Sequence, residues 1–150
     1  MSTFADTLRV LNTMKEEGVV DEYAVAGAMA LVFWTEPVAT FDLDVLVLLP
    51  GEETAIVSVA PIYEWVLIEG TPVQFLPAHG ELADESIELA ATLEYEGVPV
   101  RVVRPEHLAA LYLEPMARTR KRRERAAARE SPTFDSFAFD QLCDRFRLEP

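Results

Sequence analysis

One apolar segment, residues 45–49, places the tightest constraint on the fold of this chain. It reads Val-Leu-Val-Leu-Leu, and Asp42 and Asp44 stand on its N-terminal side. A strand with one face in water alternates apolar and polar residues, so an unbroken apolar run predicts a strand that is covered on both faces. Side chains two residues apart in a strand project to the same face, so the two aspartates are expected to lie together at the rim of a covered sheet.

The two carboxylates leave two interpretations open. Like charges roughly 6 to 7 Å apart on one face of a strand repel each other unless a cation or a hydrogen-bond donor lies between them. A bound cation would explain the pair. Alternatively, the strand begins in solvent and both carboxylates are hydrated, in which case the segment belongs to an acidic structural domain.

Helical and strand patterns alternate along the first half of the chain, and a pair of strands follows in the middle. The patterns predict helices at residues 4–17, 28–34, 52–63, 82–93, 105–114 and 134–146, and strands at 22–26, 42–49, 65–69, 72–76 and 98–103. Gly70-Thr71 is the expected two-residue turn of a hairpin. This order predicts an α/β or α+β fold in which helices pack on a mixed sheet. We place the core in residues 1–115, and a basic and amphipathic helical segment of the same domain in 116–150.

The charged residues are distributed unevenly. The net charge is −13, and no Lys or Arg occurs between Glu16 and Val100. An acidic body does not attract bare polyanions, so phosphate chemistry on it requires metal ions. The basic side chains gather late in the chain, at Arg118, Arg120, Lys121, Arg122, Arg123, Arg125 and Arg129.

Part of this basic segment has helical spacing. Positions 118, 122, 125 and 129 fall on one stripe of a helix. Such a stripe can bind nucleic-acid phosphates or the acidic face of a partner protein. It can equally be a solvated face, or dock on the acidic body of the chain itself.

We expect several other residues to have structural roles. Cys143 is the only cysteine, and no His, Cys and carboxylate spacing resembles a zinc site. We expect His107 to be a surface or packing residue rather than a cleft residue, and Trp34 and Trp65 to be core residues rather than stacking platforms for a base. No apolar stretch approaches the roughly 20 residues that span a bilayer, and the first residues lack a basic signal-peptide region, so we expect a soluble, cytoplasmic protein.

The order of motifs around the aspartates resembles a known fold. Tyr-Ala-Val-Ala-Gly-Ala-Met-Ala at residues 23–30 opens a short predicted helix, and Thr-Phe-Asp-Leu-Asp follows at residues 40–44. This arrangement resembles the nucleotidyltransferase fold of the DNA polymerase beta superfamily, and within it a group of small bacterial proteins related to abortive-infection toxins. The likeness continues through residues 70–77 and 105–108 to the basic stretch.

The resemblance implies a function and a set of site residues. It implies transfer of a nucleotidyl group from a nucleoside triphosphate (NTP) to an RNA or protein acceptor, with Mg (or Mn) held by Asp42 and Asp44. It also implies that Gly27 lets the backbone approach the triphosphate at a helix N-terminus. The implied catalytic residues are Asp42, Asp44 and Gln74, and the implied nucleotide-binding residues are Gly27, Ala28, Thr40 and Lys121.

Three departures from the superfamily pattern support an alternative function. Gln74 stands where active members carry a third carboxylate, and an amide cannot act as a base near neutral pH. Ala28 stands where a serine is often found, and Val38 where toxin-type relatives often place an arginine. The alternative is a catalytically silent binding module, for example one half of a toxin–antitoxin pair that binds its partner protein through the basic segment.

Overall fold

The computed structural model describes residues 3–35, 42–50, 66–114 and 127–149. The described elements in chain order are α1 (Thr3–Glu16), β1 (Glu22–Ala26), α2 (Gly27–Trp34), β2 (Leu43–Leu48), β3 (Val66–Ile68), β4 (Thr71–Pro77), α4 (Glu81–Glu88), β5 (Ala91–Tyr95), β6 (Val98–Val102), α5 (Pro105–Leu111) and α7 (Ser136–Phe146). None of these helices is long and apolar enough to cross a membrane. The helix predicted at residues 52–63 and most of the basic segment lie outside the described residues.

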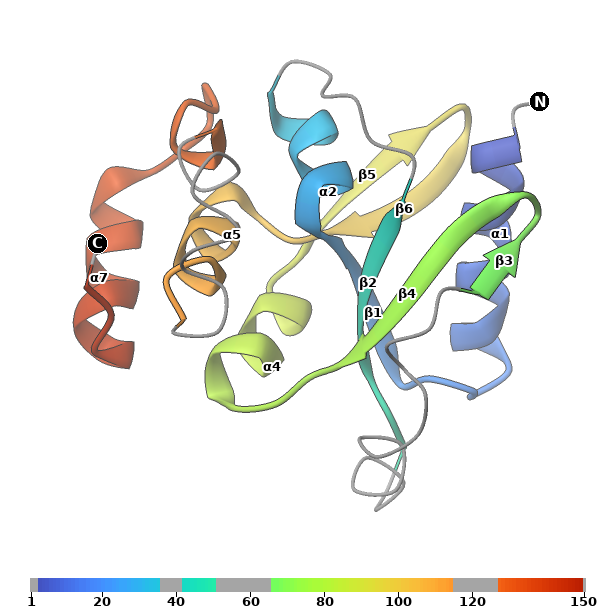
Figure 1. The fold of residues 1–150 in the computed structure, drawn as a ribbon, viewed down its shortest axis with the longest axis horizontal. Helices are drawn as coiled ribbons and strands as arrows, with labels where there is room; N and C mark the ends of the chain where they lie inside the picture. The colour runs from blue at the N-terminus through green and yellow to red at the C-terminus, as the bar shows by residue number, and fades with distance from the viewer. Residues whose placement is uncertain (1–2, 36–41, 51–65, 115–126, 150) are drawn as a thin grey trace.

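The described strands form one mixed sheet with the order β3-β4-β2-β1-β6-β5 (Figure 1). β2 is parallel to β4 and β1 is parallel to β6, whereas β1–β2, β3–β4 and β5–β6 are antiparallel pairs. Helices α1, α2 and α4 pack against this sheet. The predicted α+β class with a mixed sheet is therefore confirmed.

β2 lies in the interior of the sheet, as its apolar run predicts. It pairs with β4 on one side and with β1 on the other. Leu43, Val45 and Val47 are buried, so the strand is covered by the core. Asp42 is exposed and immediately precedes the first residue of the strand. The polar start of this segment therefore lies at the end of a covered central strand.

The β3–β4 hairpin turns one residue earlier than predicted. Its turn residues are Glu69 and Gly70, with φ angles of 49° and 82°, and Thr71 already pairs with Ile68 in the ladder. Positive φ at both central positions is the pattern of a type I′ turn, whose twist matches that of the flanking strands. The prediction of Gly70-Thr71 as the turn was wrong because the glycine occupies the second turn position rather than the first.

The helix predicted at residues 82–93 was too long, and one strand was missed. α4 ends at Glu88, and β5 begins at Ala91. β5 pairs with β6 around a second Glu-Gly turn, in which Glu96 and Gly97 have φ angles of 47° and 81°. The apolar residues of β5 continue the spacing of α4, so periodicity alone did not separate the two elements.

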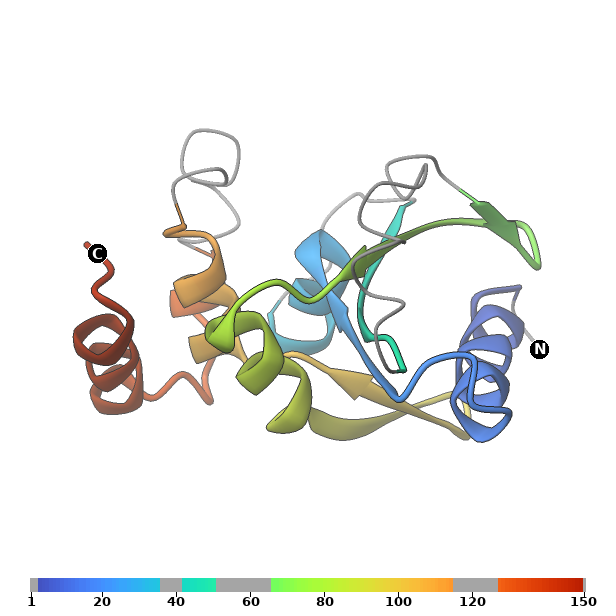
Figure 2. The same cartoon turned by 90° about the horizontal axis from the view of Figure 1, so that it is seen from below.

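α5 and α7 lie at one end of the molecule, and α1 and the β3–β4 hairpin lie at the other (Figure 1, Figure 2). α5 begins with Pro105 at its first turn, where the missing N–H is not needed. The Asp135 carboxylate caps α7 by accepting a hydrogen bond from the Ala138 N–H at 3.1 Å. Cys143 is buried in α7, as expected of a packing residue. α7 packs on α5 and closes this end of the fold.

Candidate functional site

Two neighbouring strands bring Asp44 and Gln74 together. β2 and β4 are parallel neighbours, and Asp44 lies opposite Gln74 in their register. Adjacent strands are about 4.8 Å apart, and residues at the same level project to the same face. Both residues are partly exposed. The carboxylate and the amide, far apart in the sequence, therefore share one accessible face of the sheet.

Gly27 packs directly against the Asp44 side chain. β1 pairs with β2 so that Ala26 lies opposite Asp44, and Gly27 follows with a φ angle of +62°. A β-carbon at Gly27 would lie 3.1 Å from both Cβ and Cγ of Asp44, and closer still to Oδ2. Glycine is thus required twice, once for the left-handed backbone and once for the space that the carboxylate occupies.

The start of α2 faces the same region. Its N-cap residue, Ala26, has no side-chain cap, and its first turn carries no acidic residue. The first amides of a helix lack intrahelical partners and favour a negative charge. The sequence Ala-Gly-Ala therefore builds a helix start at which a carboxylate such as that of Asp44, or a phosphate, is electrostatically favoured.

The remaining predicted site residues divide into two groups. Asp42 is exposed beside the start of β2, and Ala28 is half-buried in the first turn of α2. Asp42 precedes Asp44 by two residues, and Ala28 directly follows Gly27. Thr40 and Lys121 lie outside the described residues, as do Val38 and the basic stripe except Arg129.

The residue types at this face fit a magnesium or manganese ion. Mg²⁺ takes oxygen ligands and is commonly bound through one or two carboxylates together with substrate phosphates and waters. Asp42 and Asp44 are the carboxylates available here, and Gln74 adds an amide oxygen. Among the described residues, no group of three or more His, Cys, Asp or Glu side chains is placed to hold a metal. A metal on this face would therefore need further oxygen ligands from a substrate or from water.

A cavity of ≈ 860 Å³ lies beside α2 and the start of β4, and its volume falls in the range of roughly 300 to 1,000 Å³ that is typical of small-ligand sites. Met29 and Phe33 of α2 line it, together with Pro72, which precedes Gln74 by two residues and shares its side of β4. Phe4 and Tyr95 line the far wall and contact each other edge to face, with ring centroids 4.9 Å apart. The cavity thus offers aromatic surface beside α2 and the start of β4.

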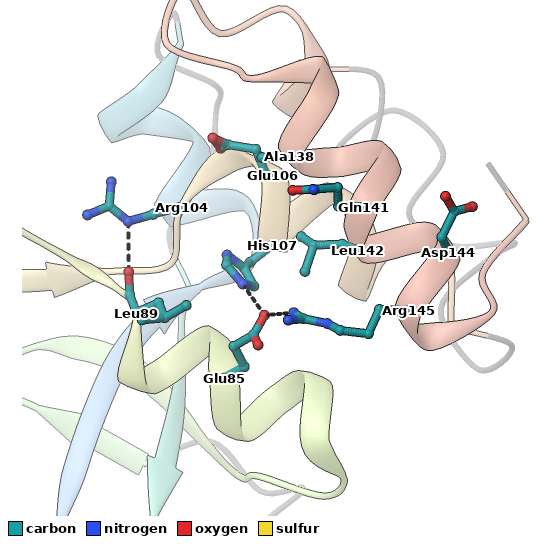
Figure 3. Close-up of a pocket in the computed structure, with 10 residues that line it drawn as sticks. All are labelled: Glu85, Leu89, Arg104, Glu106, His107, Ala138, Gln141, Leu142, Asp144 and Arg145. Atoms are coloured by element: carbon teal, nitrogen blue, oxygen red, sulfur yellow. Dashed lines mark hydrogen bonds and ion pairs between the residues drawn. The ribbon is translucent and has the colours of Figure 1, made fainter.

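The structure confirms the interpretation of Trp34 and corrects that of His107. The Trp34 indole N–H donates to the Val103 carbonyl at 2.7 Å, and the ring packs against the core. His107 is only 7% exposed, yet its Nε2 lies 3.0 Å from a carboxylate oxygen of Glu85, and it lines a cleft. His107 is buried, as expected of a packing residue, but the expectation that it has no partner and lines no cleft was wrong (Figure 3). Glu85 precedes His107 by 22 positions, so no local spacing signalled the pair.

The protein has a nucleotidyltransferase-like α+β fold. This fold is defined by the order of the strands, by the pairing of the Asp44 strand with the Gln74 strand, and by the helices that pack on the sheet. No protein-family model and no curated protein matches the chain.

Solved structures of the aminoglycoside nucleotidyltransferase ANT(2'')-Ia have a similar fold. The solution structure of this antibiotic-resistance factor aligns with a TM-score of 0.51 at 20% identity, over 97% of this chain and 91% of that chain. The crystal structure of ANT(2'')-Ia in complex with adenylyl-2''-tobramycin aligns with a TM-score of 0.54 at 19% identity, over 97% of this chain and 98% of that chain. At this level of identity the likeness shows the fold.

Proposed function

We propose that this protein binds an NTP with Mg or Mn at the Asp44 face and transfers a nucleotidyl group to an acceptor. One observation carries the proposal: Asp44 lies opposite Gln74 across parallel strands, while Gly27 at the start of α2 packs against the same carboxylate. Two distant sequence motifs thus meet at a helix start that favours negative charge. The similar fold of a nucleotidyltransferase supports this proposal.

Each residue has a defined part in the proposed site. Asp42 and Asp44 hold the metal, which, when bound, neutralises charge on the phosphates. Gly27 and Ala28 bring the first amides of α2 near the triphosphate. Thr40 and Lys121, outside the described residues, complete the nucleotide contacts in this proposal.

The proposed reaction is an in-line substitution at the α-phosphorus. A nucleophilic oxygen of the acceptor forms a bond to phosphorus, and the bond to the pyrophosphate oxygen breaks. Gln74 orients groups by hydrogen bonding but cannot accept the acceptor's proton, so that proton passes to solvent or to a substrate group. We propose an RNA or protein acceptor; the adenylyl-2''-tobramycin bound to the comparison protein adds a small polyhydroxylated acceptor to these classes.

A second candidate function is a catalytically silent module that binds a nucleotide or a partner protein, as in a toxin–antitoxin pair. Gln74 is the observation that favours it, because the position opposite Asp44 lacks a third carboxylate. The two candidates share the binding step. They differ in turnover alone, so binding and transfer must be measured separately.

Thermal unfolding with Mn or Mg, alone and with each NTP, tests the binding step. Ligand at about 100 times its Kd stabilises the native state by roughly 2.7 kcal/mol, which corresponds to about 5 to 11 °C for a domain of this size. We expect a metal-dependent nucleotide shift that disappears when Asp42 and Asp44 are both changed to Asn. As a control for the loss of a surface carboxylate, Asp140→Asn on the exposed side of α7 should keep the full shift.

Transfer is tested with α-labelled NTPs and candidate acceptors. Label on RNA, protein or a polyhydroxylated small molecule, lost in the double Asp→Asn variant, would support the enzyme. A nucleotide shift without transfer to any acceptor class would favour the silent module. A shift that persists in the double variant would contradict the proposed site in both functions.

A further inference from the structure

The side chains of α2 include a single hydrogen-bond donor. The helix reads Gly-Ala-Met-Ala-Leu-Val-Phe-Trp, so the indole of Trp34 carries the only side-chain N–H or O–H in it. A helix that is apolar on every side has no polar face to fix its orientation, and its apolar contacts are non-directional. A hydrogen bond from Trp34 therefore constrains the orientation of α2 in a way that its other side chains do not.

Trp34 makes this hydrogen bond to the residue that follows β6. Its indole N–H donates to the Val103 carbonyl at 2.7 Å. The N–H of Val103 donates in turn to the Val25 carbonyl of β1 at 2.9 Å. Val25 and Val103 are fully buried, and Trp34 is half-buried. The backbone groups of Val103 therefore have little access to water that could replace either bond.

Val103 thus holds both ends of one short segment of the chain. Its N–H bonds Val25 near the end of β1, and its carbonyl bonds Trp34 at the end of α2. α2 follows β1 directly (Figure 1). The segment between the two bonds contains Gly27, the start of α2, which packs against the Asp44 side chain. The two bonds therefore fix the part of the chain that carries the proposed phosphate contacts.

The length of α2 shows how tightly the Trp34 bond limits its tilt. Groups that bind a ligand must be held within about 0.5 Å and 10 to 20° of the productive geometry. α2 has 8 residues and is therefore about 12 Å long, so a tilt of about 10° around its start moves its far end by about 2 Å. A hydrogen bond does not survive such a displacement. An intact Trp34 bond therefore keeps the direction of α2 within the range that phosphate binding requires.

We propose that Trp34 is a positioning residue for the nucleotide, because its bond to Val103 holds the first amides of α2 toward the phosphates beside Asp44. This inference rests on the proposed function. Trp34 stands at the opposite end of α2 from Gly27, so it acts through the helix rather than by touching the nucleotide. An α2 that tilts loses an amide hydrogen bond to a charged phosphate, which corresponds to about tenfold in Kd or more.

Isothermal titration of the full-length protein with each NTP in the presence of Mn tests the proposal on Trp34→Phe, which keeps an aromatic ring and removes the donor. Tyr23→Phe is the matched control. It also removes one donor from a buried aromatic side chain, whose hydroxyl bonds Asn12 of α1 at 2.6 Å. We expect both variants to lower the urea midpoint. Only Trp34→Phe should raise the Kd of the NTP, by about tenfold.

The wild-type protein gives a second readout that does not depend on the folding of a variant. Because coupling between two sites is reciprocal, bound NTP with Mg should slow hydrogen exchange of the Trp34 indole N–H more than that of the amides of α7, which packs on α5. Equal Kd values for the wild type and Trp34→Phe, equal weakening by both variants, or equal protection of Trp34 and α7 would overturn the role of Trp34. A wild type that binds no NTP would instead overturn the proposed function, and this inference with it.

Discussion

Replacing Gly27 with alanine tests the closest packing contact of the candidate nucleotide site. The φ angle of Gly27 is +62°, and a β-carbon there would lie 3.1 Å from Cβ and Cγ of Asp44. A left-handed conformation costs an alanine about 1 to 2 kcal/mol, and an extra carbon forced into a packed site costs about 1 to 3 kcal/mol. We expect Gly27→Ala to lower the free energy of unfolding by about 2 to 5 kcal/mol.

Gly18 provides a matched control for the backbone part of this cost. Its φ angle is +77°, and a β-carbon there would meet nothing within 4 Å. Gly18→Ala should therefore lose only the conformational part, about 1 to 2 kcal/mol. Urea unfolding followed by circular dichroism measures both variants against the wild type. The amount by which Gly27→Ala lowers the free energy of unfolding more than Gly18→Ala does is the cost of the contact with Asp44.

A double-mutant cycle assigns that excess to a specific side chain. Asp44→Ala removes the carboxylate that lies over Gly27. In that background Gly27→Ala should cost less, with a coupling free energy of about 1 to 3 kcal/mol. The same cost in both backgrounds would refute the packing of Asp44 against Gly27, and with it the observation on which the proposed site depends.

Three further predictions concern Gln74, the cap of α7 and Tyr23. Gln74→Asp places two carboxylates on neighbouring strands, so without metal it should destabilise the protein by about 0.2 to 1 kcal/mol, and Mn should then raise Tm more than in the wild type. Asp135→Ala removes the cap of α7 and should cost about 1 kcal/mol, measured as a lower urea midpoint at unchanged m-value. Burial raises the pKa of Tyr23 above its ordinary 10.0, and its hydroxyl bonds Asn12 at 2.6 Å. The phenol of the unfolded chain therefore loses its proton at a lower pH than the phenol of the folded protein. The contribution of Tyr23 to the free energy of unfolding should be complete below pH 10 and should be lost as the pH rises through the folded pKa. Tyr23→Phe should remove this pH dependence.

The sequence-based predictions succeeded where one local pattern dictates the element. The apolar run of β2 and the helix start at Gly27 were predicted in the correct order along the chain, because strand patterns and a glycine turn act over a few residues. The two Glu-Gly turns were harder to predict. Glu69 and Glu96 both adopt positive φ, which is uncommon for a residue other than Gly, Asn or Asp, so neither turn had its usual sequence signature.

The cleft that His107 lines, between α4, α5 and α7, could not be predicted, for a different physical reason. Glu85 and Arg145 are 60 positions apart, and they meet because α7 packs on α5 beside α4. Periodicity indicates which face of a helix is buried, but not which helix covers it. The polar partners of His107 are therefore a property of tertiary packing, and a sequence alone shows only an isolated histidine.

Gln74 determines how metal and nucleotide should depend on each other at the candidate site. The neutral amide opposite Asp44 avoids a further like-charge pair across the two strands. In the proposed site, the same amide would leave a bound metal ion with two carboxylates, so its remaining ligands would come largely from nucleotide phosphates and water. Metal and nucleotide should therefore bind cooperatively, and each must raise the affinity of the other by the same factor. Titrations of Mn with and without NTP, and of NTP with and without Mn, measure both factors. Equal Mn affinity with and without nucleotide would show that the protein alone completes the metal site, and the two-carboxylate interpretation of Asp42 and Asp44 would fail.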